Sequence, residues 1–561
     1  MGTTPGDPED VRPSWRADDE MRSPPLQTSG TQQDMMLRAV RQSLSLAQSY
    51  LPEVESLLAR IQDRAKPSQA TGLPAFVRHL RGTEKSLTLA LSELRGASLD
   101  ADALTRLEKK LATGSIDVSR GAMHWDMLKR CRSLVAVNQV FQGSASEARK
   151  KEVARMTLSG REKQQLHRAL KEQAKVEVHV VEGGGEWLDI KTLRPDRLAR
   201  QMTDGGWGWG EHEVGDDIDE REWEDIPLAR HVRRLVAAAR LNRHEYRFPR
   251  VRLVLPNLGR GNKDVGALLD QLSRVDPLVQ VTLDDGGSAF LANGKSRPLD
   301  VAIESLVGDE HEGLTATLNM DHTILVDLVS DLTHLRLQPQ PWQASTTRAQ
   351  ILEETQHGGL MTRTLYPILD GRALVCTKEA AEHFHQVLGT VGTATERERA
   401  RYLVPVDPEI RCTPHHVLRA RFQRLSVYPL PASVQVPIRV VDEDWTWPSI
   451  CRGVAEARLP RVALDVARCA NFKSAKLSIF MHGWATGMAT LTSNKEVRGQ
   501  IRTWVEANRH DDGECGPAIW RLDVTRNLLA KSATPPEQDR SAGNGDLQED
   551  GDWIDTKRGK G

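Results

Sequence analysis

Apolar residues recur with a helical period over the first third of the chain. Long amphipathic patterns cover residues 33–66 and 74–112, and shorter ones lie near 118–142 and 145–175. Spacings of three and four residues between apolar positions are typical of helices that bury one face. The sequence therefore predicts a mostly helical N-terminal region over residues 31–175.

The pattern changes to strict alternation at residue 176. In KVEVHVVEGGGEWLDIKTL, Val176, Val178 and Val180 alternate with polar residues before a Gly-Gly-Gly turn, which is typical of a β-hairpin. Helix and strand patterns then alternate in IPLARHVRRLVAAARLN, RVRLVLPNL, VGALLDQLSRV and VQVTL. We expect a small α/β region with a parallel strand pair over residues 176–300.

Segments without apolar periodicity interrupt and flank these patterns. Residues 1–30 and 529–561 are rich in Pro, Gly, Ser and charged residues, and the tract at about 203–226 is rich in Gly and carries ten acidic residues. Such segments offer little apolar surface to bury. The sequence predicts that all three are disordered.

The C-terminal region, residues 314–528, again alternates strand and helix patterns. Its strand candidates are LTATLNM, RALVC, KLSIF and MATLT, and the stretch at about 404–478 has the character of an insertion. The predicted fold class is α/β, with an α/β C-terminal domain behind the small α/β region and the helical N-terminal region.

Charge and cysteine usage restrict the function classes. The net charge is −1, so nucleic-acid binding would require a local patch, and the arginine run at 397–424 is the candidate for RNA. The six cysteines are widely spaced, there is no secretory signal, and no apolar run is long enough to cross a membrane. We expect an intracellular protein, cytoplasmic or nuclear, with the N-terminal helices available to a protein partner and with no membrane contact.

Polar residues stand at successive strand–helix junctions of the C-terminal region. Asp321 follows the first strand, Glu382 lies in the helix after the second, Glu396 opens a later helix, and Asn494 follows MATLT. Ligands of open α/β sheets gather at the carboxyl ends of strands. Clustered carboxylates there can hold Mg²⁺ or Mn²⁺, which prefer oxygen ligands.

The order of these junctions resembles the PIN-like nuclease fold. The segments NMDHTILVDLVSDL, GRALVCTKEAAEHF, GTATERERA and TLTSN are similar to a eukaryotic family known as domain-of-unknown-function family thirteen-oh-eight, which is placed among PIN-like domains. The resemblance implies a metal-dependent ribonuclease with Asp321, Glu382 and Glu396 as Mg²⁺ or Mn²⁺ ligands and Asn494 completing the site. Glu353 or Glu354 is the fallback for Glu382.

Each of these residues also has a structural interpretation. Asp321 can cap the following helix, Glu396 can be a first-turn acid that suits the helix dipole, and Glu382 can lie on a solvated face. Asn494 brings no charge where active nucleases have a fourth carboxylate. A catalytically inactive PIN-like domain, serving as an RNA- or protein-binding scaffold, is therefore the alternative. The arginine run likewise is either a phosphate-binding surface or a solvated face.

Overall fold

The computed structural model describes residues 32–530, with gaps at 64–69, 97–100, 158, 293–296, 310, 444 and 471–474. The predictions of disorder for residues 1–30 and for nearly all of 529–561 lie outside the described residues. The described residues form two compact units, unit 1 and unit 2, which divide between Glu312 and Gly313. Each unit is described by itself.

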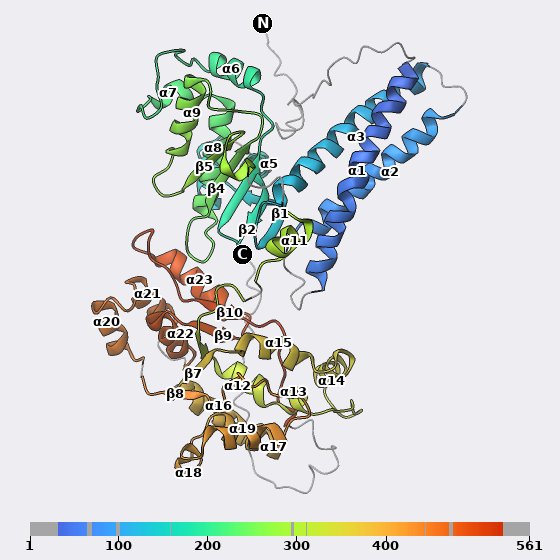
Figure 1. Ribbon diagram of the computed structural model, residues 1–561. Helices are drawn as coiled ribbons and strands as arrows, with labels where there is room; N and C mark the ends of the chain where they lie inside the picture. The colour runs from blue at the N-terminus through green and yellow to red at the C-terminus, as the bar shows by residue number, and fades with distance from the viewer. Residues whose placement is uncertain are drawn as a thin grey trace. The chain divides into compact units, whose positions relative to one another are not determined.

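Unit 1 combines three long helices with an α/β body (Figure 1). Its elements are α1 (Gln32–Gln62), α2 (Leu73–Leu94), α3 (Ala101–Leu128), β1 (Leu134–Gln142), α4 (Ser146–Arg155), α5 (Gly160–Gln173), β2 (Lys175–Glu182), β3 (Glu186–Ile190), α6 (Pro195–Asp204), α7 (Glu220–Trp223), α8 (Pro227–Leu241), β4 (Arg250–Leu255), α9 (Lys263–Ser273), β5 (Val281–Asp285), α10 (Ala289–Ala292) and α11 (Leu299–Val307).

The sheet of unit 1 has the order β1-β2-β3-β4-β5. The predicted hairpin is present as the antiparallel pair β2 and β3, and β3, β4 and β5 run parallel. The prediction of helix over 118–142 was wrong in its second half, because residues 134–142 form β1 and pair antiparallel with β2. This pairing joins the N-terminal helices to the α/β region in one unit.

The acidic segment of unit 1 is ordered, which corrects the prediction of disorder for residues 203–226. Trp207, Ile218 and Trp223 are buried in the same hydrophobic cluster as α8 and α9. Asp264 of α9 accepts hydrogen bonds from Trp207 Nε1 (3.2 Å) and from the backbone N–H of Gly210 (2.8 Å). Buried aromatic anchors therefore hold a segment whose average composition predicts disorder.

The Asp264→Ala substitution tests how the acidic segment is held. It removes both hydrogen bonds and leaves the Trp207 indole N–H unpaired, which costs about 1–3 kcal/mol locally. We expect hydrogen exchange in residues 207–219 to accelerate by about tenfold or more. Asp300→Ala, at an exposed acid of α11, is the matched control. Equal exchange in the two variants would show that Asp264 does not hold the segment.

Unit 2 is an α/β domain whose strands are separated by helices. Its elements are β6 (Thr317–Met320), α12 (His322–Val329), α13 (Asp331–His334), α14 (Ser345–His357), α15 (Leu360–Leu369), β7 (Ala373–Thr377), α16 (Lys378–Val391), α17 (Ala394–Leu403), α18 (Pro408–Arg411), α19 (His415–Arg424), β8 (Arg439–Val441), α20 (Trp447–Ala455), α21 (Val462–Cys469), α22 (Ala475–Thr486), β9 (Ala489–Thr492), α23 (Val497–Asn508) and β10 (Ile519–Arg521).

The sheet of unit 2 is parallel throughout, with the order β10-β9-β6-β7-β8. The chain moves outward from β6 to β7 and β8, and then returns to the other side of β6 for β9 and β10. The prediction of an α/β fold is confirmed. The boundary between β6 and β9 is the topological switch point, where doubly wound sheets bind their ligands.

Two features of unit 2 differ from the sequence prediction. KLSIF is part of the helix α22, because a short apolar run fits a buried helix as well as a strand. The predicted insertion at 404–478 contributes β8, which pairs with β7, so it completes the sheet. Gly483 lets α22 approach the sheet closely, since a Cβ there would lie 2.2 Å from Thr490 Oγ1.

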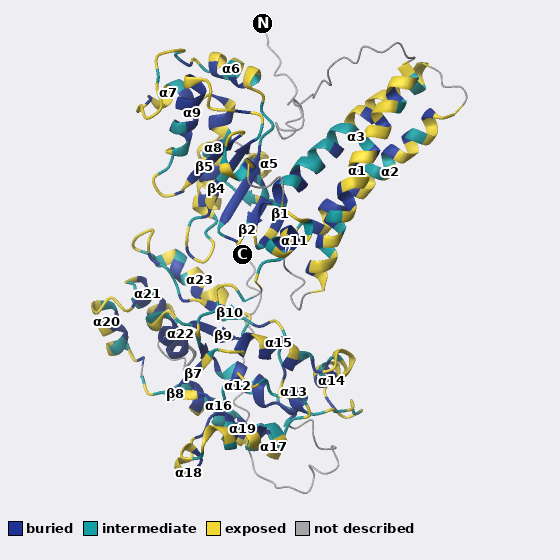
Figure 2. Cartoon of the chain, in the orientation of Figure 1, coloured by how far each residue is buried: buried dark blue, intermediate teal, exposed yellow. Residues whose placement is uncertain are grey.

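Burial follows the layers within each unit, with buried residues on the strands and on the inward faces of the helices (Figure 2). In unit 2 the core gathers apolar side chains of β6, β7 and β9 with those of α12, α15 and α16. All six cysteines are free thiols. The helices within the described residues are too short or too polar to cross a bilayer.

Buried histidines make the stability of both units depend on pH. Burial lowers the pKa of His124 in α3 and of His334 in α13 to about 3. The unfolded chain binds a proton at each position below about pH 6.5, whereas the native form does not, so stability falls as the pH falls below 6.5.

At pH 5.5 each of these two histidines is expected to lower the free energy of unfolding by about 1.4 kcal/mol relative to pH 8. His124→Gln should flatten this dependence in unit 1, and His416→Gln, at an exposed position of α19, should not. Hydrogen exchange in α3 at the two pH values measures the difference. If the free energy of unfolding of His124→Gln depended on pH as it does in the wild type, this would contradict a neutral, buried His124 in the native protein.

Candidate active site at the switch point of unit 2

The carboxyl ends of β6 and β9 lie side by side at the switch point of unit 2. Met320 pairs with Leu491, so Asp321 and Thr492 occupy the same edge of the sheet. The backbone N–H of Asp321 donates to the Leu491 carbonyl (3.0 Å), which fixes the junction directly after β6. The register of the two strands therefore decides which side chains meet here.

The Asp321 carboxylate is buried and is held by hydroxyl groups. Its Oδ2 accepts from Thr492 Oγ1 (2.6 Å) and Thr323 Oγ1 (2.9 Å), and His322 Nδ1 lies 2.7 Å from Oδ1. Asp321 occupies the N-cap position of α12, but its side chain makes no capping hydrogen bond. The Asp321 side chain therefore does not cap α12 by a hydrogen bond.

Asp321 is ionised despite its burial. Burial alone would raise the pKa of this carboxyl, but the neighbouring His322 and the hydroxyls of Thr492 and Thr323 stabilise the charged form and hold the pKa below its usual value. The structure thus maintains a negative charge at the switch point. A fixed, oriented charge of this kind suits a cation or a proton-transfer role.

A second buried carboxyl, Asp327, lies on the next turns of α12. The backbone N–H of Arg526 donates to its Oδ1 (2.7 Å), and its Oδ2 has no hydrogen-bond partner within the described residues. Burial raises the pKa of Asp327 to about 8, and the charge of Asp321 adds to the rise. Asp327 is therefore protonated at neutral pH, and the sequence analysis did not single it out.

Of the two acids in the first turns of α16, Glu379 is the less exposed, whereas the sequence prediction named Glu382. Glu382 lies on the exposed side of α16, whereas Glu379 is half-buried and its Oε2 has no hydrogen-bond partner in the described part of the chain. His383, one turn after Glu379, packs edge-on against His322 with ring centroids 4.6 Å apart. The Glu379 face of α16 is thus turned toward the Asp321 junction.

The helix α22 adds two further polar groups, which sequence reasoning also missed. Ser478 and His482 lie one turn apart and are buried, and Ser478 Oγ and His482 Nε2 have no hydrogen-bond partner among the described residues. His482 Nδ1 lies 3.1 Å from Glu443 Oε2. α22 packs on β6, β7, β9 and α16, so these groups belong to the same layer as Glu379.

Asn494 lies at the switch point, but its side chain is engaged locally. Its Oδ1 accepts from the backbone N–H groups of Glu496 (3.0 Å) and Val497 (3.4 Å), and its own N–H donates to Thr492 Oγ1 (3.1 Å). The Asn494 amide oxygen therefore stabilises the turn that leads into α23. Asn494 and Asp321 thus both contact Thr492 Oγ1, and the role of Asn494 as a ligand stays a prediction.

Glu396 has a structural role at the far end of α12. Its carboxylate accepts from the backbone N–H groups of Thr393 (2.9 Å), Asp331 (3.0 Å) and Leu529 (2.7 Å), and with Thr393 it forms the capping box of α17. α12 separates Asp331 from Asp321 by about 12 Å of helix. The structure therefore does not bring Glu396 to Asp321.

The fallback residues Glu353 and Glu354 also lie outside the switch point. Both carboxylates pair with Arg526, Glu353 Oε2 at 2.9 Å from Nη1 and Glu354 Oε1 at 2.5 Å from Nε. Glu354 also accepts the backbone N–H of Met361 (2.9 Å). These contacts attach the segment after β10 to α14.

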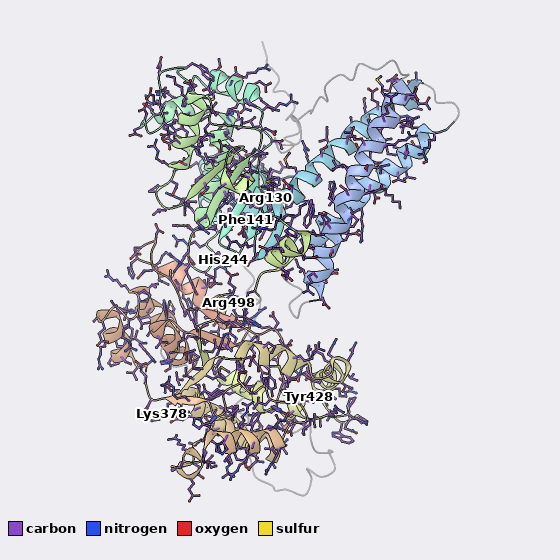
Figure 3. The ribbon with its side chains drawn as sticks, in the orientation of Figure 1. Arg130, Phe141, His244, Lys378, Tyr428 and Arg498 are labelled. Carbon is purple, nitrogen blue, oxygen red and sulfur yellow. The ribbon has the colours of Figure 1, made fainter. Side chains whose placement is uncertain are left out.

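The arginine run at 397–424 does not form one surface. Arg399 is fully buried against Asp331, and Arg419 donates to carbonyls of the segment 430–434. The exposed members are Arg397, Arg401, Arg411, Arg421 and Arg424. The prediction of a phosphate-binding surface therefore applies to these five exposed arginines. At the switch-point edge itself the first residue of α16, Lys378, is exposed (Figure 3).

The switch point offers one ionised carboxylate to a divalent ion, and the described residues form no protein cage around such an ion. Among the described residues, no three His, Cys, Asp or Glu side chains come together in a way that could hold a metal ion. Mg²⁺ keeps several waters and binds through one or two carboxylates. Asp321 supplies one ionised carboxylate of the kind that such a site needs.

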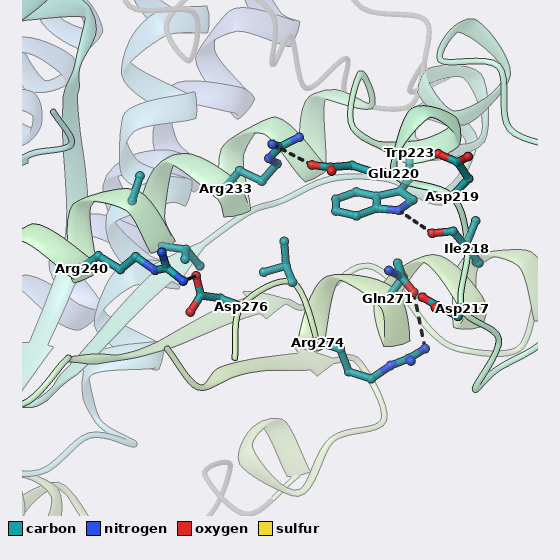
Figure 4. A pocket seen from close by; sticks show the side chains of 13 residues that line it. Asp217, Ile218, Asp219, Glu220, Trp223, Arg233, Arg240, Gln271, Arg274 and Asp276 are labelled. Carbon is teal, nitrogen blue, oxygen red and sulfur yellow. Dashed lines mark hydrogen bonds and ion pairs between the residues drawn. The ribbon is translucent and has the colours of Figure 1, made fainter. Parts of the chain in front are cut away.

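A separate pocket is present in unit 1. It has a volume of about 660 Å³ and lies between α7, α8 and the end of α9 (Figure 4). Its arginines are paired internally, Arg233 with Glu220 (2.8 Å) and Arg240 with Asp276 (2.7 Å). Acids of the pocket itself therefore engage these two arginines.

Comparison of the chain with models of protein families, with curated proteins and with solved structures gives no match. The resemblance to PIN-like domains therefore stays a prediction.

Proposed function

We propose that unit 2 is a PIN-like domain that holds one Mg²⁺ or Mn²⁺ at Asp321 and hydrolyses RNA phosphodiesters. The observation that carries the proposal is the buried, ionised carboxylate of Asp321 at the switch point of a parallel sheet. Ligand sites of doubly wound folds lie at this place.

Each neighbouring residue has a defined part in the proposed site. Thr323 and Thr492 orient Asp321 Oδ2, and His322 stands against Oδ1. Glu379 offers a carboxyl oxygen without a hydrogen-bond partner in the described residues, and Asp327, which is protonated at neutral pH, would have to lose its proton to serve as a second ligand. When bound, the ion would activate a water molecule and stabilise the leaving oxygen of the phosphodiester.

The test is cleavage of single-stranded RNA by the full chain in Mn²⁺, compared with Asp321→Asn. We expect the wild-type chain to produce cleavage that chelation of the metal stops, and the variant to produce none above background. Intact RNA with both proteins would contradict the enzymatic proposal.

A catalytically inactive PIN-like scaffold is the second candidate function. The observation that favours it is that Glu396 and Asn494, two of the four predicted site residues, are engaged by backbone N–H groups. A scaffold would bind RNA or a protein with the same affinity in wild type and in Asp321→Asn. An RNA-binding titration of the two proteins, with and without Mg²⁺, separates the candidates.

A further inference from the structure

The pocket of unit 1 between α7, α8 and the end of α9 has the size of a ligand site. Its volume of about 660 Å³ lies within the range of about 300–1,000 Å³ that is typical of ligand pockets. The side chains of Ile218, Trp223, Val236 and Val275 give it an apolar lining. One wall of the pocket belongs to the acidic segment, residues 203–226, which the structure orders.

Hydrogen bonds to α9 and to the residue after it hold this wall in place. The backbone N–H of Gly215 donates to Asp270 Oδ2 (3.1 Å), and Arg274 Nη2 donates to the carbonyl of Asp216 (2.7 Å). The wall is therefore formed before a ligand arrives. Binding in a preformed site avoids the entropic cost of ordering a loop.

The pocket carries negative charge that no cation of the described chain neutralises. Each arginine of its lining already pairs with an acid: Arg233 with Glu220 (2.8 Å) and Glu224 (3.0 Å), Arg240 with Asp276 (2.7 Å), and Arg274 with Asp270 (2.7 Å). Asp217 and Asp219 also line the pocket, are exposed, and have no cationic partner among the described residues. Figure 4 shows these two acids at one end of the pocket and the pair of Arg240 and Asp276 at the other. A ligand that complements this charge is a cation.

Gln271 adds a hydrogen-bond donor to the same pocket. Its side chain is 8% exposed, and its Oε1 accepts from Arg274 Nη2 (3.5 Å). A guanidinium can only donate, so this contact directs the amide nitrogen away from Arg274. Within the described residues, Gln271 Nε2 donates no hydrogen bond. A donor that is buried to this degree calls for an acceptor, and the carbonyl oxygen of a peptide provides one.

We propose that this pocket binds a basic peptide segment of a partner protein. A lysine or arginine side chain of the peptide lays its methylene stem on Trp223 and Val236 and brings its charge to Asp217 and Asp219. A backbone carbonyl of the peptide accepts from Gln271. A polyamine has the cations and the apolar stem but no carbonyl oxygen, so a peptide complements the pocket better.

Fluorescence anisotropy of a labelled peptide, titrated with the full chain, tests the proposal. The probe is an acetylated and amidated heptapeptide of alternating lysine and alanine. We expect saturable binding to the wild type, and the double variant Asp217→Asn, Asp219→Asn should weaken binding about tenfold or more. Asp219 is the N-cap of α7, and Asn caps helices equally well, so this variant should fold normally.

A second variant tests the pocket without changing its charge. Ala237 is an exposed lining residue of α8, and Ala237→Phe places a ring in the space that the peptide would occupy. We expect this variant also to weaken binding about tenfold or more. Hydrogen exchange of residues 207–219 should equal that of the wild type in both variants, which shows that the wall is intact.

Matched controls separate the pocket from the overall acidity of the segment. The double variant Glu213→Gln, Asp225→Asn removes two exposed acids of the same segment that do not line the pocket, and its affinity should equal that of the wild type within about twofold. Spermidine, which offers Gln271 no acceptor oxygen, should compete about tenfold more weakly than the unlabelled peptide.

Four outcomes would each overturn the proposal: no saturable binding to the wild type, equal weakening in the two double variants, unchanged affinity in Ala237→Phe, or equal competition by spermidine and the peptide. The inference concerns unit 1 alone and is independent of the function proposed for Asp321.

Discussion

Asp321→Asn is expected to lower the rate of RNA cleavage by about a hundredfold or more, since it removes the buried negative charge that the structure maintains at the switch point. The substitution preserves side-chain volume, and the amide oxygen can still accept from Thr492 and Thr323. We therefore expect the variant to remain folded, with a similar hydrogen-exchange profile in β6 and β9. The measurement is the initial rate with single-stranded RNA at saturating Mn²⁺.

Glu382→Gln is the matched control for Asp321→Asn, because Glu382 is an exposed acid on α16. We expect its rate to equal that of the wild type. Loss of activity in Glu382→Gln together with retention in Asp321→Asn would reverse the assignment that the structure makes.

Arg399→Met is expected to lower the stability of unit 2 by about 3–5 kcal/mol, because it leaves the buried Asp331 carboxylate without its cation. Arg399 Nη1 lies 2.7 Å from Asp331 Oδ1, and the two side chains are 0% and 4% exposed. The same guanidinium donates to the carbonyls of Val329 and Leu425. Hydrogen exchange of β6 and β7 in the full chain measures the loss.

Arg401→Met, two residues later on α17, is the control for Arg399→Met. Arg401 pairs with Glu398 at 3.3 Å on the surface, and such pairs contribute below about 1 kcal/mol. Equal effects of the two substitutions would show that the Asp331 pair is not a stabilising element. Replacing both Arg399 and Asp331 by apolar residues should recover part of the loss.

The contrast between Asp321 and Glu396 shows what the sequence could predict about the site. Both residues stand at the start of a helix, where an acid is a good cap or first-turn residue. Glu396 does form a capping box, whereas the Asp321 side chain turns to hydroxyls of its own helix and of β9. Only the pairing of β6 with β9, which links residues 171 positions apart, decides between the two outcomes.

The rotation of α16 about its axis explains why Glu379 is half-buried and Glu382 is exposed. The sequence places both acids in the first turns of α16, but it does not give the angle at which the helix faces the sheet. The contact between His322 and His383 sets that angle. The arginine run has a related explanation, because positions two apart on a helix face different sides, and Arg399 points inward between Arg397 and Arg401.

The prediction of disorder for the acidic segment of unit 1 was wrong because it rested on average composition. Averaged over residues 203–226 the tract is polar, yet Trp207, Ile218 and Trp223 are buried and supply enough apolar area to order it. Widely spaced aromatic residues in a polar segment are a signal that such averaging hides.

Calorimetric titration of the full chain with Mn²⁺ tests the central claim most directly, because it asks for the ion itself and needs no RNA substrate. The account predicts one binding site in the wild type and in Glu382→Gln, and loss of that site in Asp321→Asn. Absence of binding in the wild type, or an unchanged site in Asp321→Asn, would contradict a divalent-ion site at the switch point.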